Sequence, residues 1–86
     1  MTPEVCRAAR ALIGMTQREL AVLANVSTQT VADFERGARQ PHGNNIKAIR
    51  QVFEKNGIIL IEDGEKIVGM DFRNMLPADI KSQTES

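Results

Sequence analysis

The sequence predicts a mainly α-helical fold, with a four-helix bundle over residues 1–57, a two-stranded β-hairpin over residues 58–73 and a polar tail over residues 74–86. Three observations lead to this prediction. Apolar residues recur at helical spacing through the first part of the chain. Capping residues precede these apolar segments. After residue 57 the pattern changes to short β-branched runs around an Asp-Gly turn.

Local signals delimit the first two helices. Thr2 precedes Pro3, a favoured first helical residue, and Gly14 is expected to end the first helix. Thr16 and Glu19 form a capping-box pattern, in which each side chain satisfies a free backbone N–H at the start of a helix over residues 17–24. The apolar residues expected on the buried side of this second helix are Leu20, Ala21, Leu23 and Ala24.

A tight turn is expected between the second and third helices. Asn25 tolerates the left-handed backbone conformation that ends a helix. Ser27 is a good N-cap for a helix over residues 27–36, with Val31 and Phe34 facing inward and Gly37 ending it.

The rest of the chain divides into a loop, a fourth helix and the hairpin. Residues 38–44 are expected to form the loop, and Asn45 to cap a helix that Asn56 and Gly57 close. Strands are expected at residues 58–62 and 66–72, joined around Asp63-Gly64.

Two short helices joined by a tight turn form the helix-turn-helix pattern. Its polar residues fall on the outer, N-terminal half of the second helix of the pair, the part that enters a DNA major groove in such proteins. Short polar side chains can contact base edges there, and glutamine can pair with adenine through two hydrogen bonds. These polar residues are Ser27, Thr28, Gln29, Thr30 and Asp33.

Residues 4–57 resemble the XRE/Cro-type, lambdoid repressor-like helix-turn-helix family. The matching motifs are Gln17-Arg18-Glu19-Leu20-Ala21, Asn25-Val26-Ser27, Val31, Phe34-Glu35-Arg36-Gly37 and Arg39-Gln40-Pro41. The family usually has glycine at the position of Asn25, which can make the same turn. The resemblance implies a compact bundle of four or five helices, with the hairpin in place of the fifth.

The resemblance also implies roles for individual residues. Base-reading positions match Thr28, Gln29 and Asp33. Positions that contact the DNA backbone or support the base readers match Gln17, Ser27, Thr30, Arg36, Arg39, Asn44 and Asn45. Arg10 and Glu35 match a structural ion pair. Ordinary solvated surface is the alternative for these residues. The Asp33 carboxylate can accept a hydrogen bond from a cytosine amino group, but it repels phosphate.

The hairpin is apolar on both faces, although a lone two-stranded ribbon is only marginally stable in water. One face is expected to cover the bundle and the other to join a second subunit, placing two recognition helices about 34 Å apart on a palindromic operator. The candidate interface residues are Ile59, Ile61, Val68, Met70 and Phe72. The alternatives are that the hairpin caps its own bundle only, or that it binds another protein such as a toxin.

Composition narrows the function classes. Residues 1–57 carry a net charge of +3 and the remaining residues −3, so the N-terminal part of the chain is basic and the C-terminal part is acidic. A basic part suits a polyanionic partner. The single cysteine, Cys6, excludes an internal disulfide and a cysteine-based zinc site. His42 has no second ligand at metal-binding spacing, and no catalytic pair or phosphate-binding loop is recognisable, so we expect no metal, cofactor or enzyme activity.

The sequence therefore predicts a sequence-specific DNA-binding regulator of bacterial or phage origin, a repressor acting as a homodimer. We expect a cytoplasmic protein, because no apolar run reaches the ~20 residues of a membrane helix and the N-terminus lacks a signal-peptide pattern. The alternatives are an antitoxin, a restriction–modification controller protein, or a helix-turn-helix domain used only for protein contacts.

Overall fold

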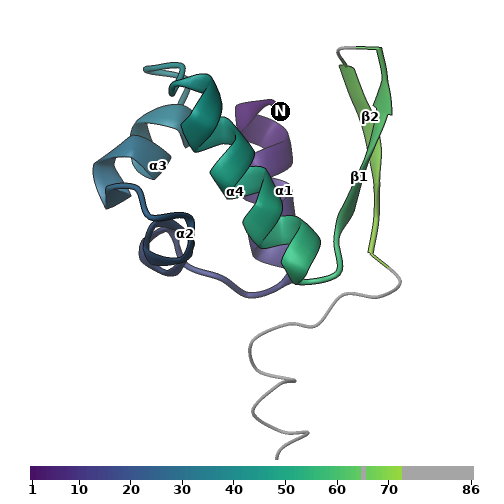
Figure 1. Cartoon of the computed structure of the whole chain (residues 1–86), viewed down its shortest axis with the longest axis horizontal. Coiled ribbons are helices and arrows are strands. Elements are labelled where there is room, and N and C mark those ends of the chain that lie inside the picture. The colour runs from purple at the N-terminus through teal and green to yellow at the C-terminus, as the bar shows by residue number, and fades with distance from the viewer. Residues whose placement is uncertain (65, 73–86) are drawn as a thin grey trace, which may run out of the picture.

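The computed structural model describes residues 1–64 and 66–72. Four helices precede a two-stranded hairpin, as the sequence predicts (Figure 1). The elements are α1 (Pro3–Leu12), α2 (Gln17–Ala24), α3 (Thr28–Glu35), α4 (Gly43–Lys55), β1 (Ile59–Asp63) and β2 (Lys66–Asp71). The expected polar tail, and Arg73 at the expected end of the hairpin, lie outside the described residues.

The predicted caps of α1 and α2 are confirmed. Oγ1 of Thr2 accepts a hydrogen bond from the backbone N–H of Val5 at 3.2 Å. Oγ1 of Thr16 accepts from the N–H of Glu19 at 3.0 Å, and the N–H of Thr16 donates to Oε1 of Glu19 at 2.9 Å. Because each hydrogen bond satisfies a donor that the helix itself leaves free, these residues fix where both helices begin.

The predicted cap of α4 is wrong. Asn45 was expected to cap the helix, but α4 begins at Gly43 and His42 is its N-cap residue, without a side-chain capping bond. The N–H groups of Asn45 and Ile46 both donate to the carbonyl oxygen of His42, at 2.9 and 3.1 Å. These two bonds close the first turn, so the helix is already formed where Asn45 was expected to start it.

The core lies between the four helices, with Leu20, Val31, Phe34, Ile49 and Phe53 fully buried. The prediction that Leu23 is also buried is wrong, because its side chain is 59% exposed.

Helical geometry explains the exposure of Leu23. At about 100° per residue, Leu20, Ala21 and Ala24 span one arc of α2, and Leu23 falls about 100° from the centre of that arc.

The hairpin packs one face against the bundle. Ile58 and Leu60 are buried there, whereas Ile59 and Ile61 are about half exposed on the opposite face. An ion pair between Arg50 of α4 and Glu62 of β1 also joins the hairpin to the bundle.

A β-bulge changes which residues of β2 face outward. The antiparallel register pairs Ile61 with Gly69 but Glu62 with Ile67, so β2 holds one extra residue, Val68, at this point. Ile67 and Met70 consequently both pack against the core, although they are three residues apart. The prediction that Met70 lies on the outer face is therefore wrong. The side chain of Val68 is outside the described part of the chain.

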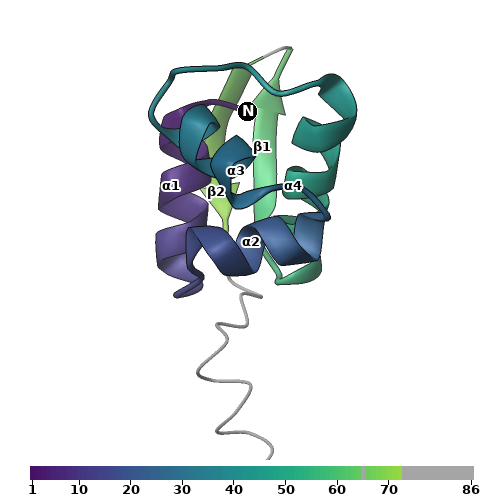
Figure 2. The ribbon, with the colours of Figure 1, turned by 90° about the vertical axis from the view of Figure 1, so that its left-hand side faces the viewer.

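The hairpin and α3 lie on opposite sides of the molecule, with α1 and α4 between them (Figure 1). Figure 2, which views the molecule from the α3 side, places the hairpin behind α3. The outer face of the hairpin therefore points away from the outer face of α3.

Candidate nucleic-acid interface

The turn between α2 and α3 is short because one residue adopts a left-handed conformation. Asn25 has φ 58° and ψ 44°, as the sequence predicts. The N–H of Val26 donates to the carbonyl oxygen of Ala21 at 2.9 Å, which closes the end of α2. Ala21 is buried, and its small side chain lets the two helices lie close together.

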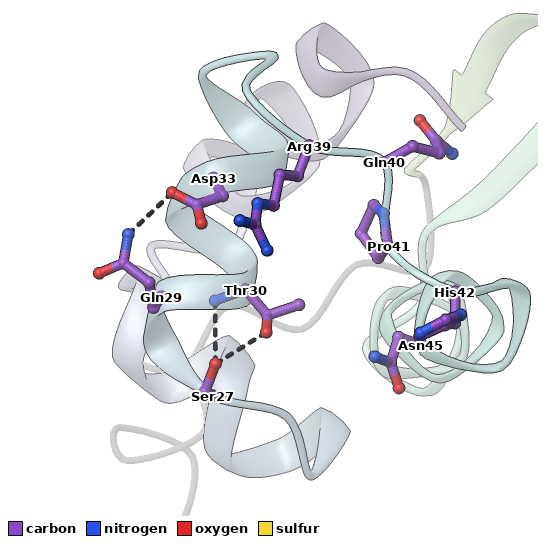
Figure 3. Close-up of a pocket in the computed structure, with 9 residues that line it drawn as sticks. All are labelled: Ser27, Gln29, Thr30, Asp33, Arg39, Gln40, Pro41, His42 and Asn45. Carbon is purple, nitrogen blue, oxygen red and sulfur yellow. Dashed lines mark hydrogen bonds between the residues drawn. The ribbon is translucent and has the colours of Figure 1, made fainter.

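The first turn of α3 is held by Ser27. Its Oγ accepts from the backbone N–H of Thr30 at 3.0 Å and lies 2.7 Å from Oγ1 of Thr30 (Figure 3). The hydroxyls of Ser27 and Thr30 are thus bonded to each other, whereas Thr28 and Gln29 are exposed on the surface. The helix therefore leaves the side chains of Thr28 and Gln29 exposed at this end.

Further along α3, Asp33 joins two neighbouring side chains. Its Oδ1 accepts from Nε2 of Gln29 at 2.8 Å, and from Nε and Nη2 of Arg36 at 3.2 and 2.7 Å. The hydrogen bonds from Arg36 and then Gln29 hold the pKa of Asp33 below its usual value. The Asp33 carboxylate is therefore ionised near neutral pH, and Arg36 balances much of its charge.

A groove of about 350 Å³ separates α3 from the start of α4 (Figure 3). The residues that line it are Ser27, Gln29, Thr30, Asp33, Arg39, Gln40, Pro41, His42 and Asn45. Figure 3 shows the Arg39 side chain extending between Asp33 and Thr30, over the groove.

The start of α4 adds hydrogen-bond donors beside this groove, next to His42, which lines it. His42 provides no side-chain capping bond, and the backbone N–H groups of Gly43 and Asn44 have no acceptor within the helix. The positive end of the helix dipole also lies here. Together with the exposed cation of Arg39, these donors favour an anionic ligand such as a phosphate backbone.

Behind α3, a buried carboxylate fixes the helix to α1 and α2. Glu35 is 2% exposed. Its two carboxylate oxygens accept from Nε and Nη2 of Arg10, each at 2.9 Å, from Nε2 of Gln17 at 3.0 Å and from the Cys6 thiol at 3.2 Å. Arg7 donates to the backbone carbonyl of Glu35, and Arg10 also donates to that of Met15.

The charge states of this cluster follow from its geometry. Burial raises the pKa of Glu35, but the hydrogen bonds from Arg10, Gln17 and Cys6 outweigh burial and hold the pKa below its usual value. The bond to Glu35 raises the pKa of Arg10. Burial, and then the hydrogen bond to Glu35, raise the pKa of the Cys6 thiol. Glu35 and Arg10 are therefore charged, and Cys6 is a neutral donor.

The structure brings most, but not all, of the candidate DNA-contacting residues together. The candidates that line the groove are Ser27, Gln29, Thr30, Asp33, Arg39 and Asn45; those that do not are Thr28, Arg36 and Asn44. Gln17 lies apart from both groups, because its amide is bonded to the buried Glu35. Gln40 and Pro41 also line the groove, although no site role was predicted for them. Their position directly after Arg39 was the available signal.

Within residues 1–64 and 66–72, no group of three or more His, Cys, Asp or Glu side chains is arranged to hold a metal ion. None of the helices described is long and apolar enough to cross a membrane.

Comparison with known protein families gives one match. A family model described as Helix-turn-helix, HTH_3, matches residues 7–58, which include α2, the turn, α3 and α4. No curated protein matches the chain.

Proposed function

The chain belongs to the XRE, lambda-repressor-like helix-turn-helix family of DNA-binding regulators, and from this we propose that it is a transcriptional repressor that binds a palindromic operator as a homodimer. We place it in the cytoplasm of a bacterium or of a phage-infected cell. Repression would follow from occupying a promoter, and the outer face of α3 would lie in the major groove.

One observation carries the proposal, namely the exposed polar end of α3 beside the groove to α4. Thr28 and Gln29 are accessible at the N-terminal turn of α3, where base edges are read in this type of domain. Beside them, the Arg39 cation lines the groove, and the first N–H groups of α4 lie next to it, so both a cation and backbone donors are offered to a phosphate. Base-reading and backbone-contacting groups thus lie side by side.

The position of the hairpin restricts how two subunits could assemble. Its outer face points away from α3, so joining two outer faces would direct the two α3 helices to opposite sides of the dimer. Joining two hairpins edge to edge would keep both α3 helices on one side, as binding to a single duplex requires. We therefore favour edge-to-edge pairing.

The edge of β1 suits this pairing better than that of β2. Among the described strands β1 pairs only with β2, so no described strand covers the other edge of β1. Ile59 and Ile61 would meet their counterparts across a β1–β1 seam, and such apolar cross-strand pairs stabilise a sheet. At the corresponding position β2 has Gly69, the pairing partner of Ile61. Because glycine has no side chain, it would add no packing at a β2–β2 seam.

Selection of bound sequences from random double-stranded DNA, with elution at rising salt, tests the function. We expect enrichment of an inverted repeat whose half-site centres lie about ten base pairs apart. Enrichment of a single half-site would contradict the dimer but not DNA recognition. A failure to enrich any sequence would contradict the regulator, and would favour a domain used for protein contacts.

Sedimentation equilibrium of the purified protein tests the assembly. Ile59→Asp combined with Ile61→Asp is expected to convert dimers to monomers, because two charges would be placed at the seam of each subunit. Val22→Asp is the matched control, since Val22 is an exposed apolar residue on α2, far along the chain from the hairpin. If the double variant remained dimeric, the dimer interface would lie elsewhere on the protein.

A further inference from the structure

The strongest unassigned feature is the hydrogen-bonded row formed by Gln29 and Asp33 of α3 with Arg36, the C-cap residue of that helix. The three side chains stand four and three residues apart, so they lie on one face of the helix. The row is complete in the free protein, before any DNA is bound. It therefore fixes how the Gln29 amide is oriented when DNA arrives.

The orientation of this amide follows from the chemistry of its partner. An ionised carboxylate only accepts hydrogen bonds, so the amide must turn its Nε2 group, and not its oxygen, toward Asp33. One Nε2 hydrogen is used in this bond. The second Nε2 hydrogen and Oε1 remain for a ligand, which leaves one donor and one acceptor.

We propose that Asp33 determines specificity through Gln29, by orienting its amide so that the protein selects adenine over guanine at the base pair that Gln29 contacts. This inference rests on the proposed DNA-binding function. It differs from the expectation that Asp33 reads a base itself, because Asp33 acts here as a positioning residue.

The major-groove edges of the two purines explain the selection. Adenine presents one acceptor, N7, and one donor, the N6 amino group, which complement the remaining N–H and Oε1 of Gln29. Guanine presents two acceptors, N7 and O6, and would need both amide hydrogens. Because Asp33 already accepts one of them, guanine would leave O6 facing the amide oxygen of Gln29, without a hydrogen bond.

The surroundings of Asp33 suit positioning better than base contact. Its side chain is only 15% exposed, whereas that of Arg36 is 67% exposed and Gln29 is also exposed. The ion pair with Arg36 offsets the repulsion that a carboxylate would otherwise exert on phosphate. The lowered pKa of Asp33 keeps it an acceptor near neutral pH.

Binding measurements on a small set of duplexes test the inference. Gln29→Ala first identifies the base pair that Gln29 contacts, as the one whose preference is lost. Wild-type protein is then expected to bind adenine there about 5- to 150-fold more tightly than guanine, the range for one good bidentate contact. In Asp33→Ala, whose folding is checked by circular dichroism, this ratio is expected to fall to about threefold or less.

Arg36→Ala is the matched control, because it removes the ion pair but leaves the bond between Gln29 and Asp33. It is expected to keep the adenine-to-guanine ratio. An Asp33→Ala variant that keeps the wild-type ratio, or changes the preference only at a different base pair, would overturn the inference. Wild-type protein without any sequence preference would instead contradict the proposed function, so the two failures are distinguishable.

Discussion

The two faces of α3 each carry a carboxylate bonded to an arginine, but the two pairs lie in very different surroundings. Glu35 is buried and joins α3 to α1 and α2 through Arg10, Gln17 and Cys6. Asp33 lies near the surface, and its hydrogen bonds join Gln29 of α3 and Arg36, the residue that directly follows the helix. The inner pair therefore positions the helix in the bundle, whereas the outer pair positions side chains on the helix.

The largest expected effect is on stability, at the inner face. Arg10→Ala would leave the buried Glu35 charge without its ion-pair partner, and we expect a loss of about 3–5 kcal/mol in the free energy of unfolding. Urea denaturation measures this loss. Arg18→Ala removes an exposed arginine of α2 and is expected to change stability little. If Arg10→Ala and Arg18→Ala lowered the free energy of unfolding equally, the ion pair between Arg10 and Glu35 would have no specific part in stability.

The next effect concerns DNA specificity, at the outer face. Gln29→Ala is expected to weaken binding by about 1–3 kcal/mol at one base pair and to remove the preference there. Titration of single-substitution duplexes by fluorescence anisotropy measures it. Thermal unfolding of the same variant should stay close to that of the wild type, since Gln29 is exposed. Equal weakening on every duplex would reassign Gln29 to the DNA backbone.

A smaller effect is expected from acid. The folded-state pKa of Glu35 lies below its ordinary value of 4.5, so its stabilising contribution is present above about pH 4.5 and is lost as the pH falls through the folded pKa. The slope from one such group is at most about 1.4 kcal/mol per pH unit. Chemical denaturation between pH 2 and 7 should show a flatter dependence for Glu35→Gln than for the wild type. Identical slopes would show that Glu35 does not contribute.

The smallest expected effect comes from Arg39, which lines the groove without a role in holding either face of α3. Arg39→Ala should weaken binding to all sequences alike and reduce the slope of log K against log salt concentration by about one. Lys47→Ala, on a part of α4 that does not line the groove, is the control and should keep the wild-type slope. An unchanged slope for the Arg39 variant would exclude a phosphate contact.

Signals that act within a few residues were readable from the sequence. The Thr16 and Glu19 capping box and the left-handed Asn25 were predicted correctly, because their hydrogen bonds and backbone conformation are set locally. The pairing of Arg10 with Glu35 was expected only from the family resemblance, since the two residues are 25 positions apart.

Contacts between elements account for two of the features that sequence reasoning missed. The bulge at Val68 broke the two-residue alternation of β2 and moved Met70 to the bundle face. The bond from Gln17 to Glu35 depends on how α2 packs against α3, which no local pattern specifies. By contrast, the four-residue spacing of Gln29 and Asp33 was visible in the sequence, and it could have indicated their hydrogen bond.

The length of the helix-turn-helix elements has a consequence for folding. α2 and α3 have eight residues each. Isolated helices shorter than about 12–15 residues are only marginally stable in water. Neither helix should persist once the core and the Glu35 cluster are disrupted. Amide hydrogens in the middle of α3 should then exchange with solvent only when the whole bundle opens, although the helix lies at the surface. The helix expected to contact DNA would thus be protected from hydrogen exchange to the same degree as the core.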